Sequence, residues 1–294
     1  MPVPAIELRP RGPVALLDAA INLCAQDAGL WSLGLTGGAL VTAAVWNVTE
    51  ALRRGEGLAL PTLLLALAWF ARGIFQGAAC HYVERLVLDP TPPSTWASLR
   101  AALGRAPTLF AAVATAFAIN TVGIVATLGL VFILVNAHLA VYGAAMRGVG
   151  SPLGLYRTSA RLLGKAAAGG LMWIRLAFWA QLLLALNLHM AVGTLIYLGR
   201  KLVALDLTFV DRYASIDNPV WLFTLATVTF AITEPLRASV AALLLIDGRV
   251  RQEGLDLVAG LEQLPRRQRP GGKPLTSRAS NAGAAVLVLL VSAL

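Results

Sequence analysis

Three charged residues stand inside segments that are otherwise apolar enough to cross a membrane. Arg72 lies near the middle of the run Leu58–Ala79, and Glu234 and Arg237 lie within the run Val220–Leu245. An ionisable side chain at that depth in a bilayer is costly, so it is rare and is usually paired or functional. These residues are therefore the first candidates for a site.

The spacing of the three residues predicts a single cluster. Arg237 follows Glu234 by three residues, so both side chains can meet on one face of a helix. Arg72 reaches the same carboxylate if the two runs are neighbours. The cluster is either a polar site for an ion or a lipid headgroup, or a structural ion pair that locks two helices, and we favour the structural pair. Pro235, beside the carboxylate, predicts a kink in its helix.

Outside this cluster, no residue pattern is typical of catalysis or metal binding. His81, His138 and His189 are far apart in the sequence. Cys24 and Cys80 lie in apolar segments and form no CxxC pair or Cys/His cluster. We therefore expect a protein that is not an enzyme and that has no metal and no cofactor.

The composition indicates a membrane protein. Of the 294 residues, 57% are apolar and 13% are charged, and the mean hydropathy is +0.72. Soluble domains have about 25% charged residues, so this chain has too little polar surface to cover a soluble fold. The composition argues against a soluble enzyme, a nucleic-acid-binding domain and a disordered protein. The net charge of +9 is better explained by membrane topology than by a nucleic-acid partner.

The lengths of the apolar runs predict an all-α fold with six transmembrane helices arranged as three hairpins. The runs are Leu30–Val48, Leu58–Ala79, Ala106–Met146, a segment within 170–198 and a segment within 220–245. The third run would be about 60 Å long as one helix. We therefore divide it by a turn at Asn120, Thr121 and Gly123. Two Gly-x3-Gly pairs, Gly34–Gly38 and Gly73–Gly77, predict close packing within the first hairpin, and a homodimer contact is the alternative.

A short amphipathic segment precedes each predicted hairpin. We expect Val14–Gln26, the segment around Trp96 and Leu153–Lys165 to lie at the headgroup level with their apolar sides towards lipid. Plain cytoplasmic connecting helices are the alternative. The second and third segments match at an offset of 60 residues, which suggests a repeated unit unless the match is chance. In the third, a basic stripe would contact anionic phospholipids, and its members are Arg157, Arg161 and Lys165.

The distribution of basic residues predicts the orientation. With the N-terminus inside, the inner segments hold 16 Lys and Arg residues and the outer loops hold five. The positive-inside rule then places the N-terminus in the cytoplasm. Residues 1–13 would be a cytoplasmic tail and residues 14–262 the membrane domain. Residues 263–281 would be a basic, Pro-rich linker, and residues 282–294 the start of a seventh span that is cut off.

The most distinctive segment follows the last apolar run. Its pattern is carried by Asp247, Arg249, Arg251, Glu253, Gly254 and Asp256. It resembles the end of a bacterial six-span family akin to the membrane domain attached to some glycerophosphodiester phosphodiesterases. The resemblance implies a non-enzymatic module of the bacterial inner membrane that lacks the phosphodiesterase domain. It would anchor or scaffold a cell-envelope protein, either a separate partner or an exported domain fused at its C-terminus. The alternative is a transporter or lipid-handling protein that uses Arg72, Glu234 and Arg237.

Overall fold

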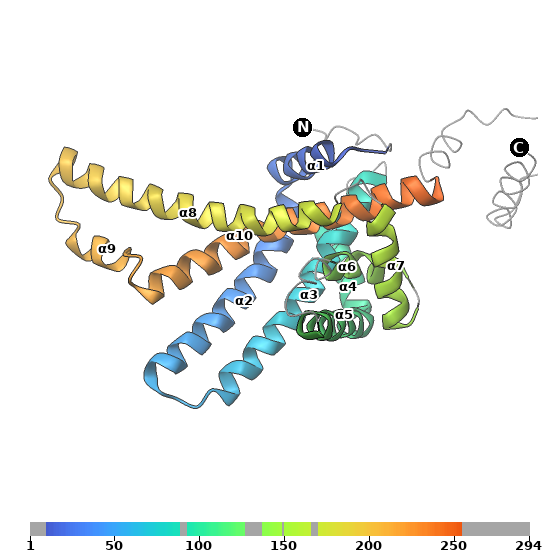
Figure 1. The fold of residues 1–294 in the computed structure, drawn as a ribbon, viewed down its shortest axis with the longest axis horizontal. Helices are drawn as coiled ribbons and strands as arrows, with labels where there is room; N and C mark the ends of the chain where they lie inside the picture. Colours follow the sequence, from blue (N-terminus) through green and yellow to red (C-terminus); the bar gives the residue numbers. More distant parts are fainter. Residues whose placement is uncertain (1–9, 89–92, 127–136, 149, 166–169, 255–294) are drawn as a thin grey trace, which may run out of the picture. The chain divides into compact units, whose positions relative to one another are not determined.

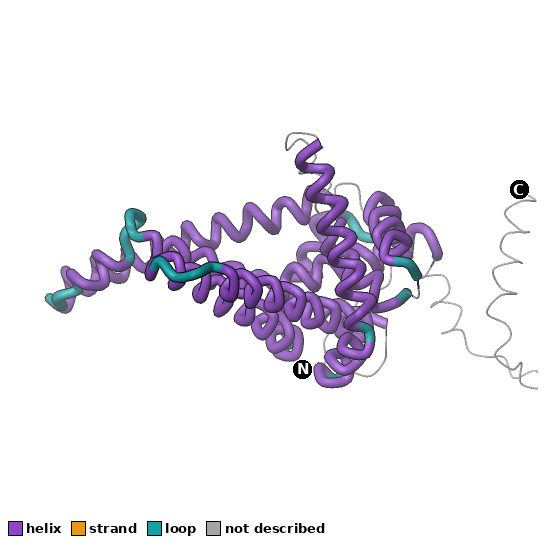
Figure 2. Tube along the Cα trace, turned by 90° about the horizontal axis from the view of Figure 1, so that it is seen from below, coloured by secondary structure: helices purple, strands orange, loops and turns teal. Residues whose placement is uncertain are grey.

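Every regular element in the described part of the chain is an α-helix (Figures 1 and 2). The computed structural model describes residues 10–88, 93–126, 137–148, 150–165 and 170–254. The helices are α1 (Pro13–Gln26), α2 (Ala28–Arg54), α3 (Ala59–Leu88), α4 (Thr95–Gly104), α5 (Ala106–Ala126), α6 (Ala137–Arg147), α7 (Pro152–Lys165), α8 (Gly170–Val203), α9 (Thr208–Tyr213) and α10 (Pro219–Glu253). The predicted linker 263–281 and the predicted seventh span 282–294 lie outside the described residues.

Five of these helices are long and apolar enough to cross a membrane. They are α2, α3, α5, α8 and α10, and they are compatible with a multi-pass membrane protein. The described part of α6 has 11 residues, which is too short to span a bilayer core of about 30 Å. The predicted number of six spans is therefore not reached within the described residues.

The turn predicted at Asn120, Thr121 and Gly123 is wrong. α5 continues through these positions to Ala126. Asn and Gly are weak helix formers in water, but backbone groups in a bilayer have no water to bond and are satisfied best within a helix. Helix-breaking glycine is accordingly more frequent in transmembrane helices than in soluble ones. The connection between α5 and α6 falls on residues 127–136, outside the described part.

α2 and α3 lie side by side and are joined by a tight turn (Figure 1). Gly55 ends α2 with a φ of +66°, a left-handed conformation that suits glycine because it has no Cβ. α10 then packs against both α2 and α3, and also against α1, α6, α7 and α8. α10 is accordingly the most buried of the long helices, and its second half forms the centre of the core.

The four glycines of the two Gly-x3-Gly pairs do not face the other helix of the first hairpin. They face α5, α6 and α10 instead. A Cβ on Gly34 would lie 2.5 Å from the ring of Pro235, and one on Gly38 would lie 2.7 Å from the backbone of Ala231. Both contacts are with α10. On α3, Gly73 faces α6 and Gly77 faces Leu109 of α5. The prediction that these pairs pack within the first hairpin is therefore wrong, because a Gly-x3-Gly spacing defines a smooth face but not its partner.

Two of the short helices, α1 and α7, bury apolar side chains against other helices. α1 buries Leu16, Ala20 and Leu23 against the core formed with α10. α7 packs against α5, α6 and α10, and it buries Leu162. The apolar faces of α1 and α7 thus contact other helices, which differs from the predicted placement against lipid. α4 is different, because Trp96 remains 66% exposed.

Candidate intramembrane polar site

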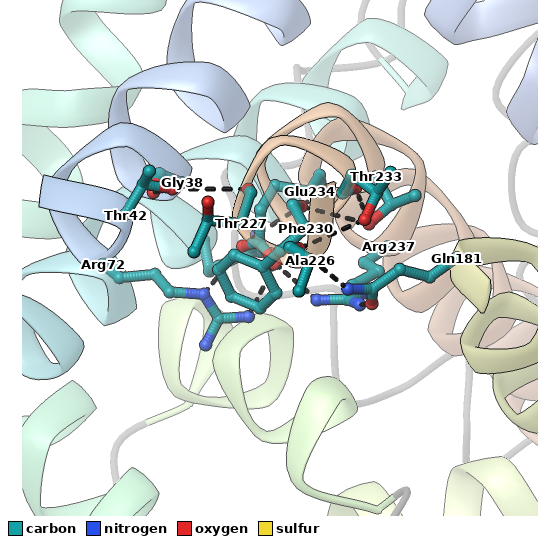
Figure 3. A network of polar contacts seen from close by, with 12 residues as sticks. Gly38, Thr42, Arg72, Gln181, Ala226, Thr227, Phe230, Thr233, Glu234 and Arg237 are labelled. Atoms are coloured by element: carbon teal, nitrogen blue, oxygen red, sulfur yellow. Dashed lines mark hydrogen bonds and ion pairs between the residues drawn. The ribbon is translucent and has the colours of Figure 1, made fainter. Parts of the chain in front are cut away.

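The centre of the candidate site is a buried ion pair between α3 and α10 (Figure 3). Arg72 donates from Nε to Oε2 of Glu234 at 2.8 Å and from Nη2 to Oε1 at 2.9 Å. This parallel, two-bond geometry is the strongest that arginine forms with a carboxylate. The side chains are 2% and 0% exposed, so the pair is removed from solvent. The contact that we expected if the two runs were neighbours is present.

Two further polar side chains complete the coordination of the carboxylate. Gln76, one turn after Arg72 on α3, donates from Nε2 to Oε2 of Glu234. Arg237, three residues along α10, donates from Nη1 to Oε1 at 2.8 Å. Its Nη2 donates to the side-chain oxygen of Gln181 on α8. One carboxylate therefore connects α3, α10 and α8.

Aromatic rings cover the guanidinium groups. The Cζ atom of Arg72 lies 4.5 Å from the ring centre of Trp69 and 5.1 Å from that of Phe230. The Cζ atom of Arg237 lies 4.8 Å from Phe230, so this ring stands between the two arginines. A cation over an aromatic face gains about 2 kcal/mol when both are desolvated. The rings therefore stabilise the charges and also keep water away from them.

Charge and hydrogen bonding at the site are not fully balanced. Two guanidinium groups face one carboxylate, which leaves a formal charge of +1 on this trio. Within the described structure, the buried Nη1 of Arg72 and the hydroxyl of Tyr142 on α6 form no hydrogen bond to a third group, and the two side chains interact with each other. The arrangement locks α3, α8 and α10 together.

The segment that carried the family resemblance forms ion pairs at the end of α10. Asp247 pairs with Arg251 at 2.9 Å, and Arg249 pairs with Glu253 at 2.8 Å. Each pair is separated by one helical turn, which is the spacing at which side chains meet. Gly254 then ends the helix with a φ of +61°.

These pairs also attach α10 to other parts of the chain. Glu84 of α3 accepts from Arg147 of α6 at 2.6 Å and from Arg249 at 3.4 Å. Arg11, just before α1, donates its backbone N–H to Asp247 at 2.9 Å, and its carbonyl accepts from Arg251 at 2.7 Å. The motif thus acts locally as a clamp that joins α1, α3, α6 and α10.

The remaining predicted site residues are separate from both clusters. Arg157 and Arg161 are exposed on α7, on the side opposite the buried Leu162. The side chain of Lys165 and all of Asp256 lie outside the described part of the structure. Among the described residues, no group of three His, Cys, Asp or Glu side chains could hold a metal ion.

Several residues of the polar site were not predicted. Gln76 had a usable signal, because it follows Arg72 by four residues and must lie on the same helix face. Gln181 and Tyr142 had none, since polar residues at the same depth on other helices are indistinguishable without a contact map. Phe230 is a typical apolar residue of a span, and only its position between two arginines gives it a role.

We compared the chain with known protein families, curated proteins and solved structures. No family model matches the chain, and no curated protein and no solved structure matches it.

The geometry of the site predicts unequal effects of its two central charges. Glu234→Leu leaves two desolvated guanidinium groups facing each other, whereas Arg72→Leu leaves Glu234 paired with Arg237 and Gln76. Breaking a buried pair by removing one partner costs about 3–5 kcal/mol, whereas an apolar replacement of the whole pair is often near neutral. We expect Glu234→Leu to lower the melting temperature in detergent more than Arg72→Leu, and the double variant to recover part of the loss.

A double-mutant cycle measures this coupling. The matched control is the exposed pair of Arg53 and Glu50, whose nitrogen and oxygen lie 2.6 Å apart but whose arginine is 64% exposed. Its removal should change the melting temperature little, since exposed pairs are screened by solvent. Strictly additive losses at Arg72 and Glu234 would contradict the account.

Proposed function

We propose that the protein is a non-enzymatic membrane module that anchors or scaffolds a cell-envelope protein in the bacterial inner membrane. The observation that carries this proposal is the sealing of the charged cluster. A transport site must exchange its ligand with water, but the carboxylate of Glu234 is fully buried and the guanidinium of Arg72 is covered by aromatic rings. A cluster of this kind is suited to holding α3, α8 and α10 in a fixed arrangement.

The resemblance of the segment after the last span supports the same proposal. Its charged residues connect α10 to the segment before α1, to α3 and, through Glu84, to α6. These structural contacts account for the charged residues without a catalytic role. A membrane domain that lacks the phosphodiesterase domain would then serve as a platform. Its client would be a separate envelope protein or an exported domain fused at the C-terminus.

A transporter or lipid-handling protein is the second candidate. It is favoured by the formal charge of +1 at Arg72, Glu234 and Arg237. Arg237 also keeps 12% of its side chain exposed. An anionic group could approach the cluster from that side.

Purification and thermal unfolding separate the two functions. We expect one exported protein to co-purify with the wild-type chain from membranes extracted in mild detergent. Chloride, phosphate and short-chain phosphatidylglycerol should not change the melting temperature. An increase in melting temperature with one of these anions, lost in Arg237→Gln, would contradict the anchor and support the second candidate.

The architecture that we propose has six spans in three hairpins, with the N-terminus in the cytoplasm. It is supported by the order of the helices, because a short helix precedes each of the packed pairs α2–α3, α5–α6 and α8–α10. It is also supported by the excess of basic residues on one side of the spans.

Cysteine labelling tests this orientation. Cys24 and Cys80 are buried, and burial raises the pKa of the Cys24 thiol, which lowers its reactivity. Both are replaced, so that the only reactive thiol is the one introduced. Single cysteines at the exposed positions Asp217 and Glu56 should react with an impermeant thiol reagent added outside intact cells. A cysteine at the exposed Ser151 should react only after lysis. The reverse pattern would invert the proposed topology.

The exposed arginines of α7 are proposed to bind anionic phospholipids at the cytoplasmic face of the bilayer. Each basic residue near an anionic surface contributes about 1 kcal/mol. We expect the double variant Arg157→Gln/Arg161→Gln to retain less phosphatidylglycerol after purification, measured by mass spectrometry. The charge-matched control, Arg53→Gln/Arg54→Gln at the other end of the spans, should retain the wild-type amount. Equal losses in both variants would remove the proposal.

A further inference from the structure

The outer part of α8, from Gln181 to Val203, has two contrasting faces. One face packs against α10 and the segment before it, where Leu188, Val192 and Ile196 join a small apolar cluster with Trp221. The opposite face contacts nothing in the described structure, and most of its side chains are exposed. This part of α8 is therefore a candidate membrane-spanning helix (Figure 1). One of its sides packs against the protein, and the other has no packing partner among the described residues.

The open face carries a regular stripe. Its members are Leu183, Asn187, Met190, Thr194 and Tyr197, all of them exposed. Their spacing of four, three, four and three residues is the heptad spacing of a left-handed coiled coil. Transmembrane helices most often pack with that same crossing geometry. The stripe therefore matches a second helix that lies alongside α8 at a small angle.

Asn187 is the unusual member of the stripe. It lies near the middle of the 34-residue helix, where lipid surrounds an exposed side chain. Its amide nitrogen donates to the carbonyl of Leu183 at 2.8 Å, which uses one of its donor positions. The rest of the carboxamide would face hydrocarbon, where it has no partner. Asparagine on a lipid-facing surface is explained if another helix supplies a donor and an acceptor.

A second copy of this chain fits that requirement. All copies insert into the membrane in the same orientation, so two α8 helices related by a twofold axis along the membrane normal are parallel. The same residue then meets itself at the same depth, and a carboxamide is both donor and acceptor to another carboxamide. Asparagine at one core position of a parallel pair is also known to fix its register. Ala191 and Gly193, exposed beside the stripe, allow close approach.

We propose that the protein forms a parallel homodimer in the membrane through the stripe Leu183, Asn187, Met190, Thr194 and Tyr197, with Asn187 of each copy hydrogen-bonded to Asn187 of the other. This proposal is independent of whether the module anchors an envelope protein. Lys201 would mark the outer end of the interface, where its ammonium group reaches the headgroups and packs 5.7 Å from the ring of Tyr197.

Oxidative crosslinking of the full chain in membranes tests the interface. With Cys24 and Cys80 replaced, Met190→Cys and Thr194→Cys should each give a disulfide-linked dimer on oxidation. Leu195→Cys is the matched control, because Leu195 is 67% exposed but lies away from the stripe. Equal crosslinking at Leu195 and Met190, or a crosslink to a different protein, would overturn the proposal.

The contribution of Asn187 is tested in lipid vesicles by the dependence of dimer formation on the ratio of protein to lipid. Interhelical hydrogen bonds of this kind change association by about tenfold in model systems. Asn187→Leu should therefore raise the dissociation constant of the dimer about tenfold, and Asn187→Gln should restore most of the affinity. The melting temperature should not fall in Asn187→Leu, because within the described residues this side chain bonds only to the carbonyl of Leu183 in its own helix. A wild-type protein that stays monomeric at all ratios would overturn the proposal.

Discussion

The ion pair between Arg72 and Glu234 is the interaction on which the rest of the structure depends. A single charge at that depth would have to neutralise, draw in water or leave the membrane, and a guanidinium hardly ever deprotonates. The two charges are tolerated because each supplies the counter-charge and the hydrogen bonds that the other lacks. This requirement fixes α3 against α10 in one register, and Gln181 extends it to α8 through Arg237.

The backbone of α10 and the glycines of α2 explain how so polar a centre can be enclosed. Pro235 follows the buried carboxylate directly, and its ring fills the space left by the missing side chain of Gly34. Gly38 allows the backbone of α2 to approach Ala231 one turn away. Close approach at both positions holds α2 against the stretch of α10 that carries Glu234, and Gly37 between them lies beside the Arg72 side chain. The rings of Trp69 and Phe230 cover another side.

The two charged clusters differ in how far they are buried. The pair at Arg72 and Glu234 is sealed and selects one arrangement of three spans. The clamp around Asp247 and Glu84 lies at the end of α10, where side chains are partly exposed and each pair contributes less. The sealed pair defines the packing of the spans, and the clamp fastens α1 and α6 to it. Two such fastenings favour the anchor that we propose, because an anchor requires a fixed arrangement of its helices.

Much of this organisation could be predicted from sequence because membranes impose simple rules on length and charge. The positions of α2, α3, α8 and α10 follow from apolar length, and the meeting of Arg72 with Glu234 follows from the cost of leaving either alone. The continuation of α5 through Gly123 could not be predicted, because glycine does not stop a helix where water is absent. The partners of Gly34 and Gly73 could not be predicted either, since a smooth helix face accepts any neighbour of suitable shape.

The most direct test of the central pair is a distance measurement in a lipid bilayer. Solid-state NMR on protein with ¹⁵N-labelled arginine and ¹³C-labelled glutamate, assigned with the Arg72→Leu and Glu234→Leu variants, reports the dipolar coupling between the Arg72 side-chain nitrogens and the Glu234 carboxyl carbon. The account predicts a coupling typical of direct hydrogen bonds, as expected for nitrogen–oxygen distances of 2.8 and 2.9 Å, and no water contact at either group. An absent coupling, or strong exchange of the Arg72 protons with water, would contradict it.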